Sequence, residues 1–417
     1  MIGLQETYVV LEHLRPAPDR APWASSSDYR GGLAGHPFGT TRTLGSDPSE
    51  LPGIQIHTGV TERDAMDALQ APNTAAAPTM ETVLISPLDA EDVDDVDASD
   101  DGSDKCSWGI AAIKAHTSSL TGAGVKVAVL DTGIDVTHEA FKDVTIDRQD
   151  FSGDGLEDRD GHGTHCAAIF FGRPVDGLRI GVAPGVTEAL AGKILRDDRS
   201  GTTDMLFGGL NWALQNKAQV ISMSLGLDFP GYVRKLVSLG VPADLATSRA
   251  LRAYAANVRL IDNLSKQSRL RVPISGGAVL VAACGNESKA DEDPDYRIAA
   301  SLPSEAEGIV SVGALQRSKA GLTVAPFSNS WARVSAPGVA IKSAKAGGGL
   351  VPKSGTNMAA PHVAGVAALW WELLARKGAE VRSPQVELKL LNNLVDDVFA
   401  PGVREVDRGD GMILAPQ

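Results

Sequence analysis

Four side chains that could take part in acyl transfer stand where predicted strands end or predicted helices begin. Asp131 directly follows the apolar run 125–130, and Asn286 follows a second apolar run. His162 lies between two glycines at the start of a predicted helix, and Asn357 lies in a Gly-bounded turn that leads into another. Such groups can orient a base, move a proton and stabilise an oxyanion if the fold brings them together.

Each of these residues also has an ordinary structural explanation. Aspartate and asparagine commonly form turns after strands, so Asp131 and Asn286 carry little weight alone. His162 and His165 could suggest a metal, but no carboxylate or third histidine completes the spacing of a helical zinc site. We assign no metal ligand and expect His165 to pack and hydrogen-bond in the interior.

From residue 108 onward, short buried strands alternate with helices. This pattern predicts an α/β fold, a mostly parallel sheet with helices on both faces, in which functional groups gather at the carboxyl ends of the strands. The clearest elements are strands at 125–130, 220–226 and 278–284 and a helix at 358–377.

The segment 353–365, Lys-Ser-Gly-Thr-Asn-Met-Ala-Ala-Pro-His-Val-Ala-Gly, resembles the nucleophile motif of the subtilisin-like serine proteases (subtilases, peptidase S8). In chain order, Asp131, His162, Asn286 and Asn357 match the family's aspartate, histidine, oxyanion asparagine and nucleophile. The resemblance implies a subtilisin-like fold and hydrolysis of peptide bonds by an Asp-His-Ser mechanism. It also implies that His162 is the general base, Asp131 orients its ring, and Asn286 helps to form the oxyanion hole.

Residue 357 departs from the motif because asparagine stands where the family has its serine, and an amide is a poor nucleophile. Three interpretations are open. The nucleophile was replaced to keep a self-processing precursor intact, the chain is a natural pseudoprotease that binds peptides or a partner protein without cleavage, or Ser354 substitutes as nucleophile. Ser354 lies before the turn, which argues against the third. We expect a serine endopeptidase in an inactive precursor form.

The resemblance also implies contacts with a protein or peptide substrate. Two segments would pair with an extended substrate, and Gly285 and Glu287 would lie beside it. Because Glu287 and the acidic loop 291–295 border the first specificity pocket in the family, they suggest a preference for Lys or Arg before the scissile bond; a solvated acidic loop is the alternative. The residues expected to pair with substrate are Arg199, Ser200, Gly201, Ser224, Leu225 and Gly226.

Residues 1–88 are predicted to form a small α+β unit, with strands at 7–14 and 81–87, a helix at 62–70 and a Pro/Gly/Ser-rich loop at 18–52. The acidic segment 89–104 lacks apolar periodicity, which is typical of a flexible linker before the catalytic domain 105–417. Many subtilisin-like proteases carry a propeptide in this place. The resemblance therefore implies that the N-terminal unit acts in cis as a propeptide, cleaved between about residues 87 and 108.

Two features depart from the compact family pattern. An insertion at about 228–273 contains a predicted amphipathic helix that packs on the domain or offers a partner surface, with Leu251, Tyr254, Val258, Ile261 and Leu264 near one face. The family's usual calcium site is not matched by His138-Glu139-Ala140 or by the loop 172–177. We expect no cofactor, with calcium as the alternative.

The overall composition excludes some classes of function. A formal net charge of −13 argues against nucleic acid or anionic membranes as partners. Three scattered cysteines are too few for a disulfide framework, which indicates reduced thiols. The N-terminus lacks a signal-peptide pattern, and no run approaches the ~18 apolar residues of a membrane span. A cytoplasmic protein is expected, with secretion by another route as the alternative.

Overall fold

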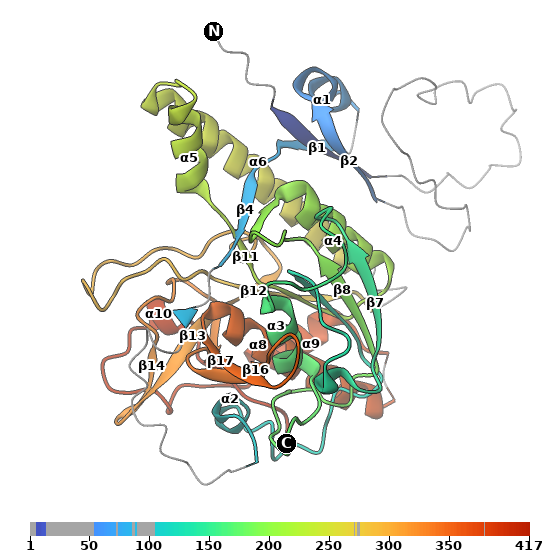
Figure 1. Ribbon diagram of the computed structural model, residues 1–417, viewed down its shortest axis with the longest axis vertical. Coiled ribbons are helices and arrows are strands. Elements are labelled where there is room, and N and C mark those ends of the chain that lie inside the picture. The colour runs from blue at the N-terminus through green and yellow to red at the C-terminus, as the bar shows by residue number, and fades with distance from the viewer. Residues whose placement is uncertain are drawn as a thin grey trace, which may run out of the picture.

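A twisted, mostly parallel sheet forms the centre of the protein (Figure 1). The structure, a computed structural model, describes residues 6–13, 54–71, 74–85, 88–89, 105–270, 272, 276–378 and 380–417. Within these residues the sheet has the order β18-β19-β15-β13-β12-β10-β6-β8-β7, with β14 paired to β13. Neighbours from β19 to β7 are parallel, whereas the β13–β14 and β18–β19 pairs are antiparallel. The predicted α/β fold is confirmed.

The strands of this sheet are β6 (Lys126–Asp131), β7 (Thr145–Asp150), β8 (Glu188–Lys193), β10 (Val220–Met223), β12 (Val279–Ala283), β13 (Ile309–Ser318), β14 (Gly321–Val324), β15 (Val334–Pro337), β18 (Leu394–Val395) and β19 (Met412–Ile413). The helices around it are α2 (Trp108–Ala112), α3 (His162–Phe171), α4 (Thr203–Gln215), α5 (Phe229–Ser238), α6 (Ala243–Leu270), α8 (Thr356–Arg376), α9 (Ser383–Leu391), α10 (Glu405–Arg408) and the 3₁₀ turn η2 (Glu139–Phe141).

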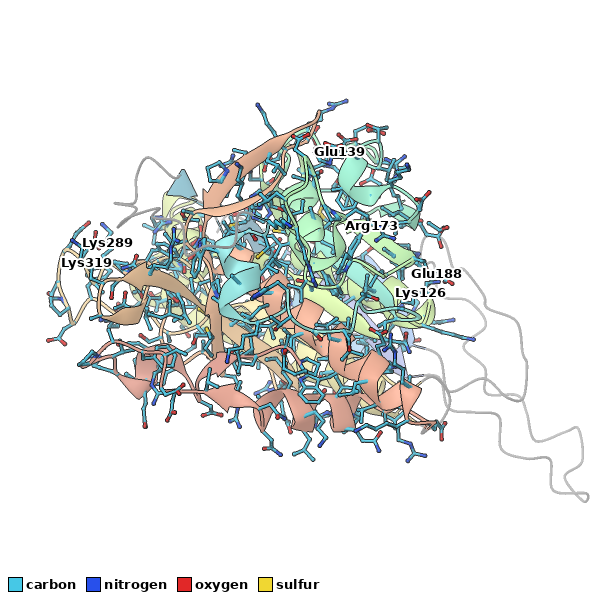
Figure 2. All side chains as sticks on the ribbon, turned by 90° about the horizontal axis from the view of Figure 1, so that it is seen from below. Lys126, Glu139, Arg173, Glu188, Lys289 and Lys319 are labelled. Atoms are coloured by element: carbon cyan, nitrogen blue, oxygen red, sulfur yellow. The ribbon has the colours of Figure 1, made fainter. Side chains whose placement is uncertain are left out.

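Alternate residues of the central strands bury their side chains in two different helix layers. Val127 and Val129 of β6 belong to the apolar cluster that contains α3 and α8. Ala128 and Leu130 belong to the cluster that contains α4 and α6. Because both faces are covered, the strand is apolar at every position from Val127 to Leu130 rather than at every second one. At their amino ends, β6 and β8 are joined by the ion pair Lys126–Glu188 (3.9 Å), at the right of Figure 2.

Helix α8 runs through the middle of the α3 layer. Among the described helices it is the one long and apolar enough to cross a bilayer, but most of its length is buried inside the protein. Its apolar composition is therefore accounted for by its central position.

The N-terminal unit has a sheet of its own, in the order β2-β1-β3, formed by β1 (Thr7–His13), β2 (Ile54–Thr61) and β3 (Thr74–Pro78), with α1 (Glu62–Ala68) packed beside it. This unit lies over α4 and α6 (Figure 1). Val9 and Leu11 of β1 share an apolar cluster with Phe207 of α4 and Ala250 of α6. The N-terminal unit and the main domain thus have one continuous core.

The predicted strand at 81–87 is in a different place from the one expected. It is β4 (Glu81–Leu84), which does not pair with β1 but lies antiparallel between β9 (Ser200–Thr202) and β11 (Leu225–Leu227) of the main domain. A third small sheet has the order β16-β17-β5, formed by β16 (Ile341–Ala344), β17 (Leu350–Ser354) and β5 (Leu88–Asp89). The predicted loop at 18–52 and residues 90–104 of the acidic linker lie outside the described residues.

The insertion contains two helices, α5 and α6, and the predicted apolar face is wrong at Leu251. Ile261 and Leu264 are buried as expected, but Leu251 is 59% exposed. The buried face of α6 runs instead through Ala246, Ala250 and Ala253, since small side chains let β3 approach the helix closely.

Candidate active site

Asp131 and His162 form a hydrogen-bonded pair at the carboxyl end of the central sheet. Asp131 is the last residue of β6 and His162 the first of α3, and Asp131 Oδ1 lies 2.8 Å from His162 Nδ1. Both side chains are buried. The N-cap of α3 is Gly161, whose φ of 83° is a left-handed conformation that glycine adopts without strain. The glycine before the histidine therefore serves the backbone turn, and an added Cβ there would lie 3.3 Å from Ala346 Cβ.

Asn357 completes a line of contacts that begins at Asp131. Its Nδ2 lies 3.1 Å from His162 Nε2 and donates a hydrogen bond to Ile85 O. Since Nδ2 is a donor, Nε2 must accept, and the ring proton is on Nδ1, where it is donated to Asp131. The amide of residue 357 thus joins the imidazole to a backbone carbonyl.

The first turn of α8 holds Asn357 in this position. Pro361 lies inside the helix and has no N–H for the Asn357 carbonyl four residues earlier. The Cys166 thiol donates to this carbonyl instead, with Sγ 3.4 Å from Asn357 O. Cys166 of α3 thereby supports the start of α8.

Asn286 lies at the same helix entrance. Its Oδ1 accepts from the backbone N–H of Thr356 (2.9 Å) and from the Thr356 hydroxyl (2.8 Å). Its Nδ2 lies beside Gly355, where an added Cβ would be 2.9 Å away. Asp131, His162, Asn286 and residue 357 are therefore brought together from four distant parts of the chain.

The predicted substrate strands are filled by the chain itself. In the register of β4, Val83 faces both Ser200 and Gly226, and Leu84 faces Leu225. Thr82 faces Gly201, and the Leu84 N–H donates to Arg199 O at 2.9 Å. Ser224 lies outside this register; its hydroxyl is 3.8 Å from Cys166 Sγ.

The N-terminal segment also pairs with the protein beyond Ile85. Strand β5, Leu88–Asp89, lies antiparallel to Lys353 and Ser354 of β17, the strand that leads into α8. The segment therefore contacts the main domain on both sides of the carbonyl that Asn357 binds. Ser354 is buried and its hydroxyl accepts from the Ala340 N–H at 2.9 Å, which engages it away from the role of substitute nucleophile.

Gly285 and Glu287 belong to a loop that Asn329 organises. Asn329 Nδ2 donates to the Glu287 carboxylate at 2.6 Å, and its Oδ1 accepts from the N–H groups of Glu287 and Ser288 at 3.1 Å. The acidic loop 291–295 is exposed to solvent. The residue whose carbonyl lies at the site is Ile85, an apolar residue.

A sequence model of the subtilase family matches residues 122–411. The chain belongs to the subtilase family. This subtilase is similar to subtilisin DY of Bacillus licheniformis, with 32% identity over 272 residues that cover 63% of this chain and 83% of that protein. It is similar to the major intracellular serine protease of Bacillus subtilis (strain 168), with 29% identity over 272 residues (63% and 73%). An intracellular serine protease of Paenibacillus polymyxa is 30% identical over 298 residues (69% and 79%). The fold is therefore that of a subtilisin-like serine protease, whose substrates are proteins or peptides.

Residues 138–140 and 172–177, which do not match the family's usual calcium motif in sequence, make contacts of their own in the structure. His138 is bonded to the Ala140 N–H (3.0 Å) and to Gly349 O (2.9 Å). The guanidinium of Arg173 donates to Phe171 O at 3.2 Å, so a cationic side chain already binds a carbonyl of this region. Glu139 and Arg173 are labelled in Figure 2.

His165 is an interior residue of the subtilase, as predicted. It is buried, and its Nε2 lies 3.1 Å from both Ile341 O and Val351 O. In the described residues, one group of three side chains could hold a metal by proximity: Asp131, His162 and Cys166. Asp131 and His162 already bond each other, and burial raises the pKa of the Cys166 thiol well above its usual value, which disfavours the thiolate a metal needs.

Sequence reasoning missed three residues that shape the site: Cys166, Asn329 and Asp158. Cys166 follows His162 by one helical turn, which is a readable signal. Asp158 stands three residues before the glycine N-cap of α3, a spacing that could have suggested a capping role. Nothing near Asn329 in the sequence indicates its contact with the loop at Glu287, because the two are far apart in the chain.

Proposed function

We propose that this subtilase is the uncleaved precursor of a serine endopeptidase, in which the N-terminal unit is a propeptide. The observation that carries the proposal is the position of Ile85. Its carbonyl accepts from Asn357 Nδ2, while β4 lies between the two strands expected to bind substrate. An extended segment in this position is in the pose of a substrate about to be cut.

With serine at residue 357, the chemistry follows from the contacts around it. His162 Nε2 would take the hydroxyl proton while Oγ attacks the Ile85 carbonyl carbon, and Asp131 would stabilise the imidazolium. Asn286 and the backbone N–H of residue 357 would stabilise the oxyanion. Collapse would break the Ile85–Ser86 bond, with His162 returning the proton to the leaving amine, and water would then hydrolyse the acyl-enzyme. An asparagine amide cannot begin this sequence, because its nitrogen lone pair is delocalised.

The proposed cleavage site and the proposed specificity both differ from those expected from the sequence. The bond that would break is Ile85–Ser86, just before the range of about 87 to 108, and the propeptide would end at Ile85 rather than at residue 88. Ile85 is buried, and an added Cβ on Gly226 would lie 3.4 Å from its Cγ1. We accordingly propose an apolar preference before the scissile bond in place of a basic one.

The test is the Asn357→Ser variant, purified beside the parent chain. We expect the variant to cut itself and to show a new N-terminus at Ser86, followed by hydrolysis of casein. Asn357→Ser combined with His162→Ala and the single variant Asn357→Ala should both stay intact. A folded Asn357→Ser chain that remains uncut would refute the precursor proposal.

A natural pseudoprotease is the second candidate, and one observation favours it. The amide nitrogen of Asn357 contacts both His162 and Ile85, which a serine hydroxyl would not do in the same way, although the buried Asn357 Oδ1 has no hydrogen-bond partner in the described residues. The pseudoprotease would bind peptides only after its own β4 strand left its place between β9 and β11. A labelled peptide copying residues 80–85 should then bind the Asn357 chain, while Asn357→Ser would remain uncut.

We also propose a cytoplasmic location. The three cysteines are free and buried, as suits a compartment that keeps thiols reduced, and two similar relatives are named intracellular serine proteases. Fractionation of producing cells tests this, and recovery of the chain from the medium would contradict it.

A further inference from the structure

One carboxylate next to the Asp131–His162 pair has no place in the chemistry above, yet it is buried and fully engaged. Asp158 is 7% exposed, and among the described ion pairs none includes it. Oδ1 accepts from the Thr132 hydroxyl and from the Gly161 N–H, both at 2.8 Å. Oδ2 accepts from the N–H (2.8 Å) and the hydroxyl (2.6 Å) of Thr164. A buried charge is tolerated here because four donors and the amino end of α3 face it.

Thr132 connects this carboxylate to Asp131. Its backbone N–H donates to Asp131 Oδ1 at 2.7 Å, and its hydroxyl donates to Asp158. The same hydroxyl accepts from the Gly163 N–H at 2.9 Å. Asp158 is thus bonded to the first turn of α3, which carries His162, and, through Thr132, to the end of β6, which carries Asp131.

We propose that Asp158 is a positioning residue that holds the end of β6 and the start of α3 in register, and so sets the His162–Asp131 hydrogen bond. Both of its oxygens are occupied by these donors, so it acts through Thr132 and the first turn of α3 and not on the substrate. Without the carboxylate, the donors of Thr132, Gly161 and Thr164 lose their acceptor. The end of β6 and the start of α3 can then shift independently. The catalytic consequence rests on the proposed function; the structural consequence does not.

A simple helix cap would make some of the same contacts, and two variants separate the possibilities. Thr132→Val removes the hydroxyl that links Asp158 toward Asp131 and that accepts from the Gly163 N–H, and it leaves the bonds from Gly161 and Thr164 to Asp158. Thr164→Val removes one capping bond and leaves the link to Thr132. A positioning role predicts a local effect on the His162–Asp131 bond from Thr132→Val, whereas a cap alone predicts none.

The first experiment uses the full Asn357 chain and needs no activity. The reporter is the downfield NMR resonance of the His162 Nδ1 proton, with the ring ¹⁵N shifts. We expect Asp158→Asn and Thr132→Val to shift or broaden it, and Thr164→Val to preserve it. Asp150→Asn is the matched control, because Asp150 also accepts four hydrogen bonds, from Ser152, Gly153 and Gly155. An unchanged resonance in both Asp158→Asn and Thr132→Val would overturn the proposal.

The second experiment adds Asn357→Ser and measures hydrolysis of a peptide substrate. We expect Asp158→Asn and Thr132→Val to lower kcat by about 10- to 100-fold with KM nearly unchanged, as for other misplacements of reacting groups. A raised KM with unchanged kcat would overturn the proposal, because the defect would then lie in substrate binding. Should Asp158→Asn fail to fold, Thr132→Val decides alone. An inactive Asn357→Ser parent would refute the proposed function, while the NMR result would still decide the role of Asp158.

Discussion

His165 is one of two histidines, with His362, whose pKa is lowered by burial and through which the fold should respond to acid. His165 is buried one helical position before Cys166, and its burial, with smaller effects from Lys353 and His162, lowers its pKa to about 3. In the unfolded chain a histidine has a pKa of about 6.5. Between these values the unfolded state binds the proton and the folded state does not, so stability falls as the pH drops below 6.5.

We predict that this one group costs about 2 kcal/mol of unfolding free energy between pH 7 and pH 5. The His165→Gln variant keeps a donor for the carbonyls of Ile341 and Val351 but cannot titrate. Denaturant unfolding at both pH values should show a smaller loss for this variant than for the parent. His116→Gln, which removes an exposed histidine, is the control and should follow the parent. Equal pH dependence of all three would contradict the prediction.

The residues at the site differ in how readable they were from sequence. Asp131, His162 and Asn286 could be placed because each stands where an apolar strand ends or a helix begins, and parallel strands end at one edge of the sheet. The hydrogen-bond partner of Asn357 in the N-terminal unit could not be predicted from the sequence. Ile85 lies 272 positions away, and its carbonyl reaches the site only because a segment of the N-terminal unit lies between β9 and β11.

At the level of elements, β4 shows why strand recognition does not give strand pairing. The run at 81–84 has the alternation of a half-buried strand, and a strand is what forms there. Its partners are β9 and β11, two short edges whose backbone groups are available to an added strand. Strands β2 and β3 of the N-terminal sheet were not predicted, since the short run Thr74–Pro78 is mostly alanine, a weak strand former.

One buried amide forms a hydrogen bond between α6 and β3. Asn257 is fully buried, and its Nδ2 donates to Pro78 O at 2.9 Å as well as to Ala253 O. We predict that Asn257→Ala weakens the seating of the N-terminal unit by about 1–3 kcal/mol, because a buried carbonyl loses its donor. Hydrogen exchange of the β1 and β3 amides should become about tenfold faster or more.

Asn216 provides the matched control for Asn257. Its Nδ2 donates to Trp212 O, four residues earlier on α4, at 2.8 Å. Asn216→Ala should leave exchange in β1 and β3 at the parent rate. Equal rates in the Asn257→Ala and parent chains would show that the apolar contacts alone seat the unit.

The contacts between the turn at Glu139–Phe141 and the loop after α3 lead to a prediction for how Tm responds to removal of calcium. Arg173 links the two, since its backbone N–H donates to Ala140 O (2.7 Å) and its guanidinium to Phe171 O. With a fixed cationic side chain in place, we expect excess EGTA to leave Tm unchanged. Arg173→Ala should lower Tm equally with and without EGTA, because about 1 kcal/mol of lost bonding shifts Tm by about 1 °C in a protein of this size. A drop in Tm of the parent chain on adding EGTA would show that calcium binds.

For the whole molecule, the α/β class was predictable because the residue pattern of a single strand shows whether one or both of its faces are buried. Continuous apolar runs such as Val127 to Leu130 require helices on both faces, and the structure has them. The way the N-terminal unit docks was not predictable from such runs. Its buried face looks like that of any small sheet, and only the structure shows that Val9 and Leu11 share a core with α4 and α6.

This shared core makes the N-terminal unit part of the fold, in addition to supplying the strand β4 between β9 and β11. A chain that begins at Lys105 would expose the apolar residues that Leu11 and Met80 cover, among them Phe207 and Ala250. Each large side chain that loses its cover costs about 1.5–3 kcal/mol. We predict that this truncated chain, keeping Asn357, refolds from denaturant in lower yield than the full chain and binds the dye ANS. The comparison is refolding yield and ANS fluorescence of both chains under the same conditions. Equal yields without dye binding would mean that the main domain buries this surface by itself. The N-terminal unit would then contribute only the strand β4 between β9 and β11.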